Sequence, residues 1–187
     1  MLKQARELWY AFFACLLIGG SYALVVSLTQ QFPPAGELTG HFIGIVGFIL
    51  MLMTETLYSF RKRSRTARWG SMARWMQFHI FTGIVGPFMV LLHTSWKFNG
   101  LAGATMLLTI IIVVSGFIGR YIYTRIPRTI DGMEDATAVS SMQADVLNRA
   151  RRLMSLWHTI HIPIGMALFT AAFAHILGAL YFSTFLK

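Results

Sequence analysis

The chain alternates between long apolar runs and short polar segments. Five of the runs are long enough for an α-helix to cross about 30 Å of hydrocarbon, because a helix rises 1.5 Å per residue. The pattern predicts an all-α membrane protein whose five transmembrane helices form a single domain over residues 1–187. The expected spans are residues 8–28, 42–60, 78–96, 101–123 and 157–182. The segment 124–156 is expected to lie on the cytoplasmic side, with an amphipathic helix that either docks a partner or lies on the lipid surface.

Composition supports this membrane setting. Apolar residues make up 56% of the chain, charged residues make up 12%, and the mean hydropathy is +0.60, all far from the averages of soluble proteins. The first run follows Lys3 and Arg6 but has no clear small-residue cleavage site before Gln30, so we expect an uncleaved anchor. Because Cys15 is the only cysteine, a C-x-x-C-H haem site, a cysteine-ligated iron–sulfur cluster and an internal disulfide are excluded.

The basic residues are distributed very unevenly over the connecting segments. Fourteen of the sixteen lysines and arginines fall on one side of the predicted topology, and only Lys97 and Lys187 fall on the other. The positive-inside rule then predicts a cytoplasmic amino terminus and a periplasmic or external carboxyl terminus. Since topology accounts for the net charge of +9, we expect membrane lipid as a partner and no nucleic acid.

Four histidines form two pairs with the same spacing, His79 to His93 and His161 to His175. Fourteen residues return to nearly the same helix face and separate the side chains by about 21 Å along the axis. Each of the two spans therefore carries one imidazole near each membrane face. Neutral imidazole is a good axial ligand of haem iron, so the pattern predicts two noncovalent haem b groups in a helical bundle.

The topology decides which histidines can meet. The third and fifth spans run in the same direction, so His79 is expected to pair with His161 near the cytoplasmic face, and His93 with His175 near the outer face. The competing interpretation is that these are polar residues contacting neighbouring helices, as single intramembrane histidines often do. The matched spacing and matched depth of four histidines favour the ligand interpretation.

Other residues near the histidine stripes are candidates for contact with the cofactors. Gly83, Gly86 and Gly165 are predicted to let a porphyrin lie close to the helix backbone, although small residues also serve close helix packing in membranes. Arg74 is a candidate partner for a haem propionate. These residues complete the predicted cofactor-binding set.

Two histidines remain outside the pairs. His158 competes with His161 for the inner iron, but it lies about 100° off the stripe of His175, so His161 is preferred. His158 is left as a candidate partner of a propionate or a quinone. His41 opens the second span on the outer side, and its alternatives are a plain surface histidine and a quinone or proton-handling residue.

Several short motifs resemble those of bacterial dihaem membrane cytochromes b, within the ferric-reductase-like and cytochrome b561-like superfamily. The motifs are Q-F-H-I-F-T-G-I-V-G-P at residues 77–87, H-T at 93–94, S-G-F-I-G-R-Y at 115–121, R-I-P-R at 125–128 and W-H-T-I-H-I-P at 157–163. The resemblance covers about residues 40–183. It implies electron transfer between an inner haem held by His79 and His161 and an outer haem held by His93 and His175.

The resemblance also implies a place for the chain in a bacterial inner membrane, as the redox subunit of an oxidoreductase. Reductases of that superfamily usually continue into a flavin- and nicotinamide-binding domain, whereas this sequence contains no G-x-G-x-x-G motif. The expected electron partners are therefore a quinone or quinol, which is also a candidate further cofactor, and a separate redox protein. The alternative function is an accessory haem- or pigment-binding subunit with a mainly structural role in a larger electron-transfer complex.

Overall fold

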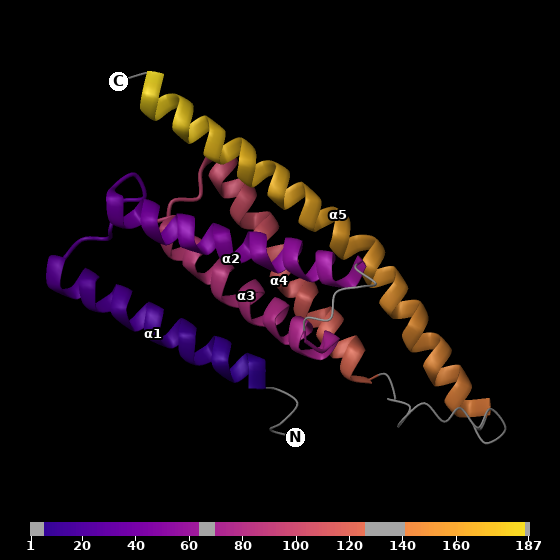
Figure 1. Cartoon of the computed structure of the whole chain (residues 1–187). Coiled ribbons are helices and arrows are strands. Elements are labelled where there is room, and N and C mark those ends of the chain that lie inside the picture. The colour runs from indigo at the N-terminus through magenta and orange to yellow at the C-terminus, as the bar shows by residue number, and fades with distance from the viewer. Residues whose placement is uncertain (1–5, 64–69, 126–140, 186–187) are drawn as a thin grey trace.

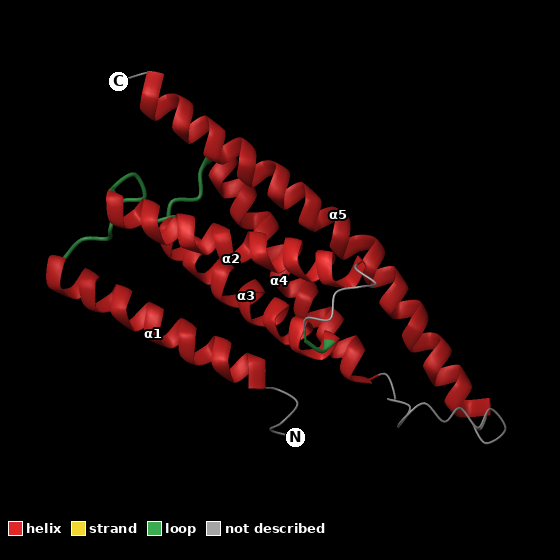
Figure 2. Ribbon diagram, viewed as in Figure 1, coloured by secondary structure: helices red, strands yellow, loops and turns green. Residues whose placement is uncertain are grey.

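The computed structural model describes residues 6–63, 70–125 and 141–185. The described chain consists of five long α-helices, with no strand among these residues (Figure 1, Figure 2). The helices are α1 (Arg6–Thr29), α2 (Leu38–Arg63), α3 (Met72–His93), α4 (Gly100–Arg125) and α5 (Ser141–Phe185). All five are long and apolar enough to cross a membrane. The prediction of an all-α, multi-pass membrane protein with five transmembrane helices is confirmed.

Several helix boundaries differ from the sequence prediction: α2 runs over 38–63 and not 42–60, and α3 begins at Met72 and not at residue 78. α3 ends at His93 and not near Trp96, because Ser95 and Trp96 take left-handed backbone conformations with φ of 49° and 63°. α5 begins at Ser141, well before the expected start of the span at residue 157. Its stretch of residues 141–156 is continuous with the spanning helix, and the whole of α5 forms one long helix with a bend (Figure 1). Residues 126–140, part of the segment 124–156 in which the amphipathic helix was expected, lie outside the described residues.

The bundle is built from two helix pairs and one outer helix. α2 packs along α3, and α4 packs along α5; these are the two most extensive contacts of the fold. α1 packs on the other side of α3, and α3 touches α4 over a short stretch. α3 and α5, which carry the four paired histidines, are not packed extensively against each other in the described residues. The histidine helices therefore belong to different pairs.

The contact between α2 and α3 is a close backbone approach at two glycines. A Cβ atom added to Gly47 would lie 2.9 Å from the carbonyl oxygen of Gly86, and one added to Gly86 would lie 2.9 Å from the carbonyl oxygen of Gly47. Near this crossing, the hydroxyl group of Thr54 on α2 donates a hydrogen bond to the hydroxyl oxygen of the fully buried Thr82 on α3, at 2.7 Å. Small residues at the crossing and a hydroxyl pair beside it are typical of helix association in membranes.

α1 is held mainly by its first turns and its middle. Glu7, which is buried, forms an ion pair with Arg120 of α4. Gly19 leaves room for the ring of Phe88 on α3, since a Cβ there would lie 3.2 Å from that ring. The first helix is therefore attached to α3 and α4 and has little contact with α2.

The crossing of α2 and α3 generates a stability prediction. Gly47→Ala should destabilise the folded protein by about 1–3 kcal/mol, because the new methyl group meets backbone atoms that cannot move aside. Gly20→Ala is the matched control, since a Cβ at this exposed α1 glycine meets no atom within 4 Å. Thermal unfolding in detergent measures both variants. Equal melting temperatures for the two would contradict the close approach.

Candidate functional site

The structure brings the four paired histidines together in the combination expected from the topology. His79 on α3 and His161 on α5 lie close enough to interact electrostatically. At the other end of the same two helices, His93 and His175 also interact electrostatically. We name these regions the His79 end and the His93 end of the bundle. Each end thus holds one imidazole from α3 and one from α5.

The His79 ring is oriented by the backbone of α2. Its Nδ1 lies 2.9 Å from the carbonyl oxygen of Thr54, and the ring of Tyr58 lies 4.9 Å away. A carbonyl can only accept a hydrogen bond, so Nδ1 must carry the proton and donate it. In the neutral ring, Nε2 then keeps its lone pair and points away from α2. This is the tautomer that metal-ligating histidines adopt when a carbonyl holds the other nitrogen.

His93 repeats this arrangement at the other end of α3. Its Nδ1 lies 2.9 Å from the carbonyl oxygen of Gly40, again on α2. Gly44, one turn further along α2, makes room for the imidazole, because a Cβ there would lie 2.8 Å from ring atoms of His93. The same tautomer follows, with the lone pair on Nε2. Both α3 histidines are therefore positioned by carbonyl groups of the helix that packs along them.

His161 is positioned by α4, the partner of its own helix. Its Nδ1 lies 3.0 Å from the hydroxyl oxygen of Ser115, and the indole of Trp157 stacks on its ring at 4.5 Å. Trp157 in turn donates from Nε1 to the Ser115 carbonyl at 2.7 Å. The indole occupies a notch left by Gly119, where an added Cβ would lie 2.3 Å from the ring. Ser115, Trp157 and Gly119 together fix the position of this imidazole.

The unpaired histidines lie beside the pairs. His158 interacts electrostatically with His161 and with Lys62, and its ring lies 4.8 Å from that of Trp157. His41 lies with Nδ1 3.0 Å from the carbonyl oxygen of Glu37, the residue just before α2, and its ring lies 6.4 Å from that of His93. His161, and not His158, thus lies within electrostatic range of His79, and His41 lies next to His93 at the other end.

The predicted small residues lie on helices packed against α2 or α4, whereas Arg74 is exposed. Gly86 faces Gly47, and a Cβ on Gly83 would lie 3.4 Å from the side chain of Thr54, so both glycines serve the packing of α3 on α2. Gly165 is buried, and a Cβ added there would lie 3.9 Å from the side chain of Ile112 on α4. Arg74 lies exposed in the first turn of α3. Helix packing, the alternative considered for the glycines, describes these contacts.

The donor set suits a ligand that needs two imidazoles at each end. Among the described residues, no group of three or more histidine, cysteine, aspartate or glutamate side chains could hold a metal ion by itself. A haem iron requires only two axial ligands from the protein, since the porphyrin supplies the others. Each end of the bundle offers two neutral imidazoles, one from α3 and one from α5, which fits that requirement. Three of the four rings, those of His79, His93 and His161, have Nδ1 hydrogen-bonded to protein.

Several residues of this arrangement were not identified from the sequence. The carbonyl oxygens of Thr54 and Gly40 carry no side-chain signal, because every residue has a carbonyl group. Ser115 and Gly119 stand in the S-G-F-I-G-R-Y motif, four residues apart on α4, but only the packing of α4 against α5 reveals their target. Gly44 could have been found from its place one turn after Gly40, as a pair of small residues on one helix face.

Comparisons of this chain with protein-family models, with curated proteins and with solved structures found no match.

Proposed function

We propose that the chain is a dihaem b-type membrane cytochrome that moves electrons across the membrane, between a quinone pool or a partner redox protein and an acceptor on the opposite face. His79 and His161 would hold one haem, and His93 and His175 the other. The observation that carries the proposal is the bonding of the α3 rings: both donate from Nδ1 to a carbonyl of α2, which leaves Nε2 available on each.

The chain's own residues have distinct tasks in this proposal. The Thr54 and Gly40 carbonyls hold the α3 imidazoles in one tautomer, which also strengthens them as ligands. Ser115 and Trp157 hold His161 from the side of α4. Apolar helices keep water from the space between the two ends. A bound haem supplies reversible one-electron chemistry, and two haems about 21 Å apart along the helix axes would carry an electron through most of the hydrocarbon.

Sidedness follows from the charges. Nine described lysines and arginines outside α1 lie toward the His79 end, whereas Lys97 lies toward the His93 end. The nine are Arg61, Lys62, Arg63, Arg74, Arg120, Arg125, Arg149, Arg151 and Arg152. By the positive-inside rule the His79 end is cytoplasmic and the His93 end faces the periplasm of a bacterial inner membrane. The chain then acts as the redox subunit of an oxidoreductase.

The ligand assignment predicts a pairwise pattern of haem loss. His79→Ala and His161→Ala should each remove the same haem, and His93→Ala and His175→Ala should each remove the other, because one axial ligand is lost in every case. Haem content per chain, measured as the pyridine haemochrome, should fall from two to one, and the remaining haem should keep its reduced-minus-oxidised bands.

His158→Ala is the control for these variants, since His158 lies beside His161 without reaching His79. It should retain both haems. Loss of a haem in His158→Ala with full retention in His161→Ala would reverse the assignment of the inner ligand. Purified wild-type protein that carries no haem, or that binds a pigment on single histidines, would overturn the proposal itself.

The two haems should differ in reduction potential. Positive charge near a haem favours its reduced form, and Lys62 lies close enough to His158 to interact with it. Lys62→Gln should therefore lower the midpoint of the haem at the His79 end by tens of millivolts, on the order expected for one partly screened charge. Lys97→Gln, at the opposite end, should leave that midpoint unchanged. A potentiometric titration that shows a single transition, with the amplitude of one haem, would contradict the two-haem arrangement.

The notch at Gly119 should tune the haem held by His161. Gly119→Ala should push the indole of Trp157 off the His161 ring, because the added methyl group overlaps the indole. Electron paramagnetic resonance should then show shifted g values for this haem alone, with haem content unchanged. Gly116→Ala is the control, since a Cβ on this α4 glycine meets nothing within 4 Å. Identical spectra for both variants would show that Trp157 does not position the ligand.

A further inference from the structure

Two arginines from different helices converge on one glycine at the His79 end. Nη2 of Arg61, in the last turn of α2, lies 3.4 Å from the carbonyl oxygen of Gly70, in a contact at the protein surface. A Cβ atom added to Gly70 would lie 3.9 Å from Nε and Cζ of Arg74, in the first turn of α3. Both guanidinium groups therefore lie beside Gly70. Like charges held this close repel each other, and a bound anion would offset the repulsion.

The protein itself supplies no anion for these two arginines in the part of the chain that the structure describes. The ion pair found there joins Arg120 to Glu7, and neither Arg61 nor Arg74 forms one. The dipole of α2 favours basic residues in its last turn. It gives no reason, however, for an arginine of α3 to join them. The side chain of Arg61 is also held against the protein, since its Nε is buried, so the guanidinium is already positioned for a ligand at its outer edge.

The start of α3 adds backbone donors next to the arginines. Ser71 is the N-cap residue, and its side chain makes no capping bond. The first amide bonded within this turn is that of Arg74, which donates to the Ser71 carbonyl. The amides of Met72 and Ala73 are therefore left for another acceptor, and residues 71–74 are exposed. Free amides at the positive end of a helix favour a phosphate group.

The surroundings of this cluster suit a lipid. α2 and α3 are both long and apolar enough to span a membrane, and the cluster lies where one ends and the other begins. Phe60, just before Arg61, is 59% exposed, and Met72 is 37% exposed. The half-buried Trp75 is of the type that lies at headgroup level. A ligand with a phosphate group and apolar chains would contact both kinds of side chain.

We propose that Arg61, Arg74 and the first amides of α3 bind the phosphate group of an anionic phospholipid, whose chains lie beside Phe60 and Met72. Guanidinium groups pair with phosphate oxygens through two parallel hydrogen bonds. Basic pockets between spanning helices on the cytoplasmic side suit such headgroups. Inorganic phosphate offers the same oxygens without the chains. A zwitterionic headgroup carries a cation, which the two arginines repel.

Lipid binding at this cluster does not depend on the proposed function. Arg74 lies five residues before His79, which places the two side chains about 140° apart around α3. They therefore face different sides of the helix, and the phosphate site lies apart from the histidine pair. A lipid bound there would brace α2 against α3 at the end where the Thr54 carbonyl holds His79.

Native mass spectrometry of the full chain in detergent tests the site. Titration with phosphatidylglycerol should give one tightly bound lipid, and phosphatidylcholine should bind about tenfold more weakly. Arg61→Gln and Arg74→Gln should each weaken phosphatidylglycerol binding about tenfold, as expected for one lost charge-assisted hydrogen bond. Arg63→Gln is the matched control, because it removes the same charge from an exposed position in the same turn of α2. It should bind like the wild type.

Two further measurements separate the lipid from a free ion and from a folding defect. Inorganic phosphate should displace the lipid no better than sodium chloride of equal ionic strength; specific displacement would assign the site to the ion and refute the lipid. Phosphatidylglycerol should raise the melting temperature of the wild type and of Arg63→Gln but not of Arg61→Gln. Equal melting temperatures without lipid show that the variants are folded. Equal losses of binding in Arg63→Gln and Arg61→Gln, or equal affinities for the two lipids, would contradict the site.

Discussion

The close approach of α2 and α3 at Gly47 and Gly86 sets the geometry on which the candidate site depends. With no Cβ at either position, the two backbones come near enough for carbonyl groups of α2 to reach side chains of α3. Thr54 lies seven residues after Gly47 and bonds His79, and Gly40 lies seven residues before it and bonds His93. Seven residues are almost two helical turns, so all three positions share one face of α2. A wider crossing would leave both imidazoles without these partners in apolar surroundings.

The two helix pairs solve the same problem with different groups. On α2 the acceptors are backbone carbonyls, which fix the tautomer of His79 and His93 because they cannot donate. On α4 the partner of His161 is the hydroxyl of Ser115, which can donate or accept. Any residue of a helix has a carbonyl oxygen that can accept a second hydrogen bond, whereas a hydroxyl partner requires a serine at that position. The ring stacked by Trp157 is thus held by side chains that mutation can remove, and the α3 rings are held by groups that it cannot.

Much of the fold could be predicted from hydropathy, because a spanning helix has to be apolar over its full length. The fourteen-residue spacing likewise predicted which histidines share a helix face, and charge asymmetry predicted that the two helices run in parallel. Contacts between helices were harder to predict from the sequence. A glycine such as Gly86 can make room either for a cofactor or for a neighbouring helix, and only the packing of α2 places Gly47 against it. The end of α3 at His93 depends on two left-handed residues, Ser95 and Trp96, that are not glycines, so turn propensity gave no signal.

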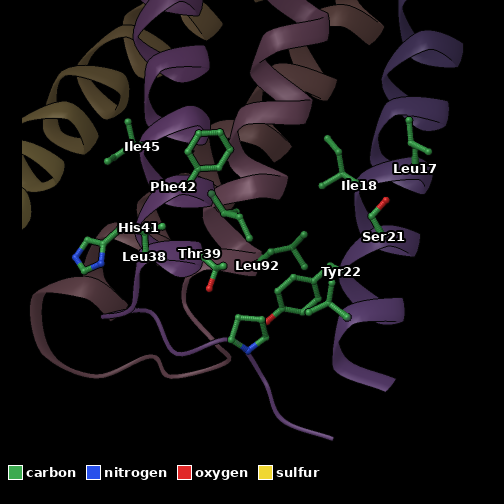
Figure 3. A pocket seen from close by; sticks show the side chains of 13 residues that line it. Leu17, Ile18, Ser21, Tyr22, Leu38, Thr39, His41, Phe42, Ile45 and Leu92 are labelled. Carbon is green, nitrogen blue, oxygen red and sulfur yellow. The ribbon is translucent and has the colours of Figure 1, made fainter. Parts of the chain in front are cut away.

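α1 shows why a helix with little burial can still have a defined position. A buried ion pair is costly to break, because removing one partner leaves an unpaired charge in apolar surroundings. The pair of Glu7 with Arg120 therefore fixes the start of α1 against α4, and Gly19 fixes its middle against Phe88. After Gly19, the described contacts include no ion pair or close approach that attaches α1 to α2. A groove lined by Tyr22 lies between the two helices in this region (Figure 3). The same attachment that anchors the first helix thus leaves its last turns separated from α2, on the side where His93 is held.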